Sequence, residues 1–166
     1  MQNTEDDIDL VAYWTKKDPA RWIAGVMAGL LAGIVAMAFA GVLGIVGGGD
    51  VLIGVKVGAL PIMGGKALEA GVHMPTLIAG FVTLEALAAF LGFVFAHFAF
   101  TNRLSMLFGM GLTWAAFTWV FIINLFSQSF RDVFVADFSR GGAFFVCCAF
   151  GLSLTSVAFF DRLVRR

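Results

Sequence analysis

The sequence predicts an all-α membrane protein with four transmembrane helices. Of its 166 residues, 60% are hydrophobic and only 13% are charged, whereas a soluble domain carries about 25% charged and about 45–50% apolar residues. The apolar residues also gather in four runs, each long enough to cross about 30 Å of hydrocarbon as a helix. We therefore expect the lipid bilayer to solvate a single domain, with spans at residues 19–46, 75–100, 104–126 and 142–160.

The first run has clear start and stop signals. Asp18 and Pro19 begin it, because proline at the first helical position loses no hydrogen bond, and Gly47-Gly48-Gly49 ends it. The preceding tail, residues 1–18, has Thr4 followed by Asp7, which is typical of a helix start. We expect a short amphipathic helix on the cytoplasmic membrane surface, with a disordered tail as the alternative.

The stretch between the first two spans is apolar but interrupted. Residues 50–71 contain several glycines, Pro61 and four charged residues, and no charge-free run there is long enough to cross the bilayer as a helix. This pattern predicts an interfacial or re-entrant helix followed by a turn. Residues 127–140, before the last span, predict a polar connection.

Basic residues indicate the orientation. The N-terminal tail with the start of the first span, the turn at 101–103 and the tail after residue 160 carry seven of the eleven Lys and Arg, and four lie on the other side. Loops rich in Lys and Arg stay in the cytoplasm. Both termini are therefore expected there, in a multi-pass protein of the bacterial inner membrane.

A ridge of small residues marks the first span. Gly25, Gly29 and Gly33 are four positions apart, and Gly41 continues the row. Residues four apart stack on one helix face, and a face without side chains lets another backbone approach closely. The ridge is expected to receive either the second span of the same chain or a neighbouring subunit.

Glu85 lies near the middle of the second span. An ionised carboxylate at the bilayer midplane is costly, so this group should be protonated, hydrogen-bonded or paired. Thr113, Thr118 and Ser153 reach a similar depth on other spans and are candidate partners. Glu85 is then either a proton or ion site, a polar ligand for a cofactor, or a hydrogen-bonding link between helices.

The histidines argue against a shared metal or haem within the chain. His73 and His97 are separated by about 36 Å at ~1.5 Å per helical residue, so they cannot bind the same group. His97 alone is a candidate axial ligand to haem or pigment, and the alternative is an interfacial hydrogen-bonding role. The cofactor is unknown, and no metal constellation is visible.

Other features restrict the function. The net charge is zero, which disfavours nucleic acid as a partner, and no nucleotide loop or nucleophilic triad is present. Cys147 and Cys148 are expected to be apolar fillers. The 19 phenylalanines predict lipid-facing surfaces or, alternatively, surfaces for quinone, pigment, lipid tails or another subunit.

The pattern of a small-residue first span, a glycine-interrupted connection, a histidine at the mouth of the second span and Gly109-Met110-Gly111-Leu112-Thr113-Trp114 on the third is similar to a loose group of small four-helix bacterial membrane proteins. The resemblance implies a bacterial inner membrane and no particular chemistry.

Three functions are compatible with these features. The leading expectation is a non-catalytic accessory subunit of a larger, energy-transducing membrane complex. The second is a small proton- or ion-linked transporter or channel that uses Glu85. The third is a subunit that binds haem, quinone or pigment through His97.

Overall fold

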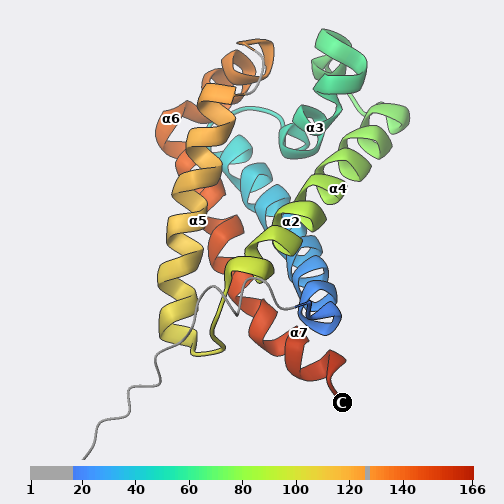
Figure 1. Cartoon of the computed structure of the whole chain (residues 1–166). Coiled ribbons are helices and arrows are strands. Elements are labelled where there is room, and N and C mark those ends of the chain that lie inside the picture. The colour runs from blue at the N-terminus through green and yellow to red at the C-terminus, as the bar shows by residue number, and fades with distance from the viewer. Residues whose placement is uncertain (1–16, 126–127) are drawn as a thin grey trace, which may run out of the picture.

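The computed structural model describes the backbone of residues 17–125 and 128–166, and the side chains of residues 17–122 and 141–166. These residues form helices connected by turns (Figure 1). Four of the helices are long and apolar enough to cross a membrane, at Pro19–Val46, Met74–Phe98, Leu104–Ile122 and Gly141–Val164. The structure thus confirms the all-α fold with four candidate spans. The interfacial helix expected in the N-terminal tail lies outside the described residues.

Helix α2 (Pro19–Val46) is the central element of the bundle. Its first turn is capped by Asp18, whose side chain accepts a hydrogen bond of 3.2 Å from the backbone N–H of Arg21, and Pro19 occupies the first helical position. Its end at Gly47 is followed by Gly48 in a left-handed conformation, with φ of 73°. The helix packs against α4, α6 and α7, so it makes most of the interhelical core.

Helix α4 (Met74–Phe98) lies across the small-residue face of α2 (Figure 1). The approach is so close that a Cβ atom built on Gly92 would lie 2.6 Å from Cα of Gly29. Side chains there would push the helices apart, so the glycines determine this crossing. The ridge predicted from sequence therefore receives a helix of the same chain.

Helices α5 (Leu104–Leu125) and α6 (Gln128–Ser153) form the other half of the bundle. Gly111 and Gly151 meet at their crossing, where a Cβ atom on Gly111 would lie 2.5 Å from the carbonyl oxygen of Gly151. A single 3-10 turn, η2 (Leu154–Ser156), links α6 to α7 (Val157–Val164), so the last span is almost continuously helical.

The last helix starts earlier than the hydrophobic pattern suggests. Residues 128–140, expected as a polar connection, already belong to α6, and the helix continues through Gly141 and Gly142. Glycine inside a helix costs about 1 kcal/mol relative to alanine, which packing against α5 and α2 can offset. The side chains of residues 128–140, including the charged residues expected there, lie outside the described part of the chain.

The interrupted stretch after α2 folds as a short helix and a turn. Helix α3 (Ile53–Met63) packs on α4, α2 and α6, and the 3-10 turn η1 (Gly64–Leu68) follows it. With 11 residues, α3 spans about 16 Å at 1.5 Å per residue, which is too short to cross a bilayer. Gly64 adopts φ of 60°, which allows the chain to turn after α3.

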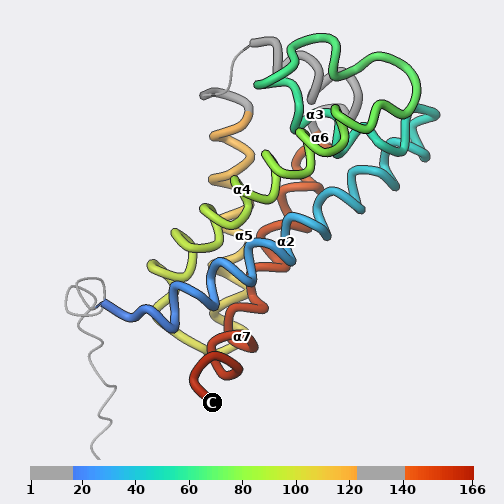
Figure 2. Tube along the Cα trace, turned by 90° about the vertical axis from the view of Figure 1, so that its right-hand side faces the viewer, coloured from blue at the N-terminus to red at the C-terminus, as the bar shows by residue number. Residues whose placement is uncertain are grey.

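The connections separate cleanly between the two ends of the bundle (Figures 1 and 2). The start of α2, the α4–α5 connection at 99–103 and the end of α7 lie at one end. The segment 47–73 and the start of α6 lie at the other end. The first and last helices of the described chain therefore begin and finish on the same side.

Candidate functional site

Glu85 faces the glycine ridge of α2 from the middle of α4. Its side chain is 8% exposed, and a Cβ atom placed on Gly33 would lie only 2.7 Å from its Oε1. The missing side chain at Gly33 thus provides the space that the carboxyl group occupies. Gly29 and Ala88 continue the same tight contact on either helix.

The carboxyl group lacks the polar partners that its depth suggested. Within the described residues, Oε1 of Glu85 is buried and has no hydrogen-bond partner. The hydroxyls of Thr113, Thr118 and Ser153 donate to carbonyl oxygens four residues earlier in their own helices, at 3.0, 2.8 and 2.7 Å. These three residues therefore do not form a polar cluster with Glu85.

An apolar cavity of about 110 Å³ lies between the helices. Helices α2, α3, α4, α5 and α6 all contribute to its wall. Gly33 and Ala88 are part of that wall, whereas Glu85 does not line it. Other lining residues include Met37, Val57, Thr118 and Cys147.

The histidines lie at opposite ends of α4. His73 precedes the helix and its Nε2 lies 3.2 Å from the carbonyl oxygen of Ala70. His97, in the last turn, is half-buried among aromatic rings, with centroid distances of 6.4 Å to Trp22 and 5.5 Å to Phe98. No group of three or more His, Cys, Asp or Glu in the searched residues is placed to hold a metal ion.

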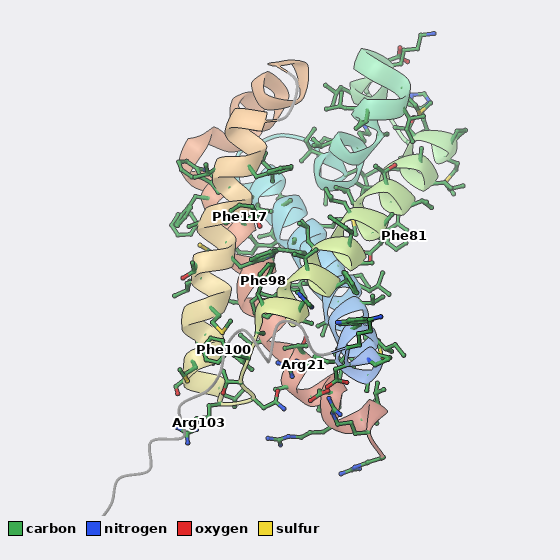
Figure 3. The ribbon with its side chains drawn as sticks, in the orientation of Figure 1. Arg21, Phe81, Phe98, Phe100, Arg103 and Phe117 are labelled. Carbon is green, nitrogen blue, oxygen red and sulfur yellow. The ribbon has the colours of Figure 1, made fainter. Side chains whose placement is uncertain are left out.

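A buried ionic network closes the end of the bundle at which α7 finishes. Arg21 on α2 forms an ion pair with Asp161 on α7, with 3.3 Å between Nη1 and Oδ2, and both side chains are 5% exposed. Its Nη2 donates to the carbonyl oxygens of Ala99 and Thr101 at 2.8 and 3.0 Å. Figure 3 shows Arg21 at this end, near the turn that carries Arg103.

The network extends to the surface through further polar groups. Asn102 accepts from Arg21 and donates to Asp161 at 3.1 Å. Arg165 pairs with Asp161 at 2.9 Å and also with Asp18, the cap of α2. The sequence indicated Arg21 and Arg165 as orientation signals and Asp18 as a helix start. Their pairing was not predicted, because it depends on how distant segments meet.

A second buried charge holds the segment after α2. Lys56 on α3 is 1% exposed, and its Nζ donates to Oδ2 of Asp50 at 2.5 Å and to the carbonyl oxygen of Glu69 at 3.0 Å. The hydrogen bond from Lys56 holds the pKa of the Asp50 carboxyl below its ordinary value, and the backbone N–H of Leu52 adds to this effect. Lys56 therefore joins the start and the end of the segment, a role that its place in an apolar stretch did not reveal.

A groove of about 480 Å³ separates the end of α4 from the start of α5. The two helices meet at the rings of Phe95 and Trp114, whose centroids are 5.8 Å apart. Phe98 and Thr113 are exposed at the groove. The remaining lining residues are Met106, Gly109 and Met110.

No protein-family model matches this chain, and no curated protein or solved structure matches it either.

Proposed function

We propose that the protein is a non-catalytic accessory subunit of a larger, energy-transducing membrane complex, and that it binds a transmembrane helix of a partner subunit in the groove between α4 and α5. The observation that carries this proposal is a second small-residue ridge, on α5, which the described residues leave uncovered. Transmembrane helices associate through such ridges because the bilayer provides no hydrophobic force between them.

Ser105, Gly109 and Thr113 form this ridge at intervals of four residues. All three are exposed, and a Cβ atom on Gly109 would have nothing within 4 Å. The corresponding ridge on α2 is filled by α4, which shows how closely a helix can pack on such a face in this protein. A partner helix could approach the α5 backbone as closely as α4 approaches α2.

The chemistry of the groove also suits a protein partner. Phe98, Met106 and Trp114 line it, and aromatic and methionine side chains are enriched at protein interfaces.

Purification under native conditions tests the proposal. The protein, extracted into nanodiscs or a mild detergent, should bring stoichiometric partner chains with it. Gly109→Leu should remove them, because the leucine side chain occupies the space above the ridge. Leu112→Phe, which adds bulk at an exposed α5 position outside the groove lining, should retain them.

Two results would contradict the accessory role. One is a chain recovered alone, or only with copies of itself, from native membranes. The other is partner recovery that Gly109→Leu leaves intact while the variant remains folded.

We further place the protein in a bacterial inner membrane with both termini in the cytoplasm. Exposed basic residues lie beside the start of α2, in the α4–α5 connection and on or after α7, and these elements share one end of the bundle; the residues are Lys17, Arg103, Arg162 and Arg166. An excess of Lys and Arg on one side favours the cytoplasmic face. Reporter fusions after residue 166 and within residues 64–68 should give opposite locations.

Proton- or ion-linked transport is the second candidate, and the unpartnered Oε1 of Glu85 favours it. Buried ionisable groups within a span frequently belong to a proton or ion path. Flux into liposomes should then fall strongly on Glu85→Gln. A native protein without flux, or a variant with native flux, excludes this function.

A further inference from the structure

We propose that the outward face of α7 binds an anionic phospholipid, with Arg162 and Arg166 holding the phosphate group and with Phe159 and Leu163 contacting the acyl chains. This inference goes beyond the role of a complex subunit, because it concerns a lipid at the end of the last span and not a partner helix in the α4–α5 groove.

Packing against α2 fixes the rotation of α7 about its own axis. Val157, Ala158 and Asp161 are buried and form the inward face of the helix. Asp161 is held further by its ion pair with Arg21 on α2. The opposite face of α7 therefore points away from the bundle.

Two apolar and two basic residues share this outward face. Phe159 and Leu163 are four positions apart, and they are 65% and 49% exposed. Arg162 and Arg166 are also four positions apart and exposed, and the backbone of Arg165 keeps right-handed helical angles after the last helical residue. Residues three and four positions apart are neighbours on a helix surface. The face therefore changes from apolar at Phe159 to basic at Arg166.

The length of the last span places this change at the boundary between acyl chains and headgroups. The span Gly141–Val164 has 24 residues, which cover about 36 Å at 1.5 Å per residue, whereas the hydrocarbon core is about 30 Å thick. Its last turn therefore reaches the headgroup level, and Phe159, more than one turn earlier, faces acyl chains. A phospholipid presents its own apolar and charged parts in the same order.

The two arginines of this face have no carboxylate partner in the described part of the chain. Asp161 and Asp18, the carboxylates of the buried ionic network, are already paired with other arginines. Like charges four positions apart on a helix repel each other. A phosphate group between Arg162 and Arg166 relieves this repulsion, and guanidinium groups bind phosphate through parallel hydrogen bonds.

The combination of charge and apolar surface favours a lipid over a soluble anion. A free phosphate ion can use only the two arginines and leaves Phe159 and Leu163 without a partner. Basic residues that follow a span closely are typical of sites for anionic headgroups. A phospholipid with net negative charge supplies the ionic and the apolar contacts from one molecule.

Phosphatidylglycerol and phosphatidylcholine with identical acyl chains provide a matched pair of probes, because both contain phosphate but only the first has a net negative charge. Native mass spectrometry of the full chain in a mild detergent, titrated with each lipid, gives the apparent dissociation constant of the first bound lipid. The ratio of the two constants measures the preference for the anionic lipid, since the acyl-chain contacts cancel. The native protein should prefer phosphatidylglycerol.

Arg162→Gln should lower this preference about five-fold, which corresponds to about 1 kcal/mol for one basic residue at the membrane surface. Arg162→Lys should lower it less, because the charge remains. Arg103→Gln is the matched control, since it removes an exposed charge at the same end of the bundle but outside α7 (Figure 3), and it should retain the preference. Leu163→Gln should weaken both lipids equally and leave their ratio unchanged.

A soluble headgroup distinguishes the lipid from a free anion. Glycerol phosphate at the concentration of the lipid should not displace phosphatidylglycerol, because it has no acyl chains. Displacement would identify a site for soluble anions and overturn the proposal. An equal loss of preference in Arg162→Gln and Arg103→Gln would overturn it as well.

A native protein without preference for phosphatidylglycerol would also refute the lipid site, and would leave an acidic segment of a partner protein as the occupant of this face. The substituted side chains are all exposed, so the variants are expected to fold.

Discussion

Arg21 and Asp161 are 140 positions apart in the sequence, and they form an ion pair in which both side chains are 5% exposed. The pair joins the first turn of α2 to the last helix of the bundle. Two backbone carbonyls of the α4–α5 connection bind the same guanidinium group, so three segments meet at one side chain.

Asp161→Ala should destabilise the fold strongly. Removal of one partner of a buried ion pair leaves an uncompensated charge and typically costs about 3–5 kcal/mol. The thermal midpoint in detergent should fall well below that of Arg162→Gln, an exposed position on the same helix. Arg21→Leu combined with Asp161→Leu should recover part of the loss, because it removes both charges. Equal midpoints for Asp161→Ala and Arg162→Gln would refute the structural role of the pair.

Gly29→Leu should separate α2 from α4. A Cβ atom at Gly29 already overlaps the carbonyl oxygen of Ala88 and lies 3.0 Å from its carbonyl carbon, and neither backbone can move independently. We expect a loss of several kcal/mol, in the range that severe overpacking produces, at about 3 kcal/mol or more. Unfolding by titration with a denaturing detergent measures it. Gly65→Leu is the matched control, since a Cβ atom there has open space, and a comparable loss in the control would count against the crossing.

The Asp50–Lys56 pair predicts a stability change in acid. The pKa of Asp50 is lowered in the folded protein by Lys56, so the pair stabilises fully above the unfolded value of about 4. That stabilisation is lost as the pH falls through the lower folded value. The protection of residues 50–69 against hydrogen exchange, taken relative to the intrinsic exchange rate at each pH, should therefore fall below about pH 4 in the native protein. Asp50→Asn should show lower protection at neutral pH and little further loss in acid. Identical pH profiles for both proteins would contradict the pairing.

The adjacent cysteines should react at different rates. Cys147 is buried and lines the cavity, whereas Cys148 is half-buried on the neighbouring face of α6. A membrane-permeant maleimide should therefore modify Cys148 first. Mass spectrometry of Cys148→Ser and Cys147→Ser variants over time separates the two rates. The prediction is wrong if the Cys147 thiol, measured in Cys148→Ser, reacts faster than the Cys148 thiol, measured in Cys147→Ser.

The helix ends and the tight crossing were predictable from sequence because local chemistry determines them. Asp18 and Pro19 start α2 and Gly47 ends it, and the spacing of Gly25 and Gly29 indicates a close helix contact. The early start of α6 was not predictable from hydropathy. Residues 128–140 mix four charged residues with apolar ones, and hydropathy does not distinguish such a connection from a helix that extends beyond the apolar run.

The site was predictable only in part. The depth of Glu85 follows from counting residues along its helix, but its lack of a partner depends on the rotation of three other helices. The burial of Lys56 and the pairing of Arg21 with Asp161 require tertiary contacts that no local pattern contains. Local sequence patterns therefore do not predict which residues pair across segments that are far apart in the chain.

The central position of α2 has a consequence for biosynthesis. Ribosomes deliver α2 before the other three long helices, with its bare Gly/Ala face exposed and with Arg21 still lacking Asp161, which is synthesised 140 residues later. During that interval neither the glycine face of α2 nor the Arg21 guanidinium group has the partner that a later helix provides. Chains interrupted before α7 would lack the carboxylate that pairs with Arg21, so the bundle end closes only when the last helix is made.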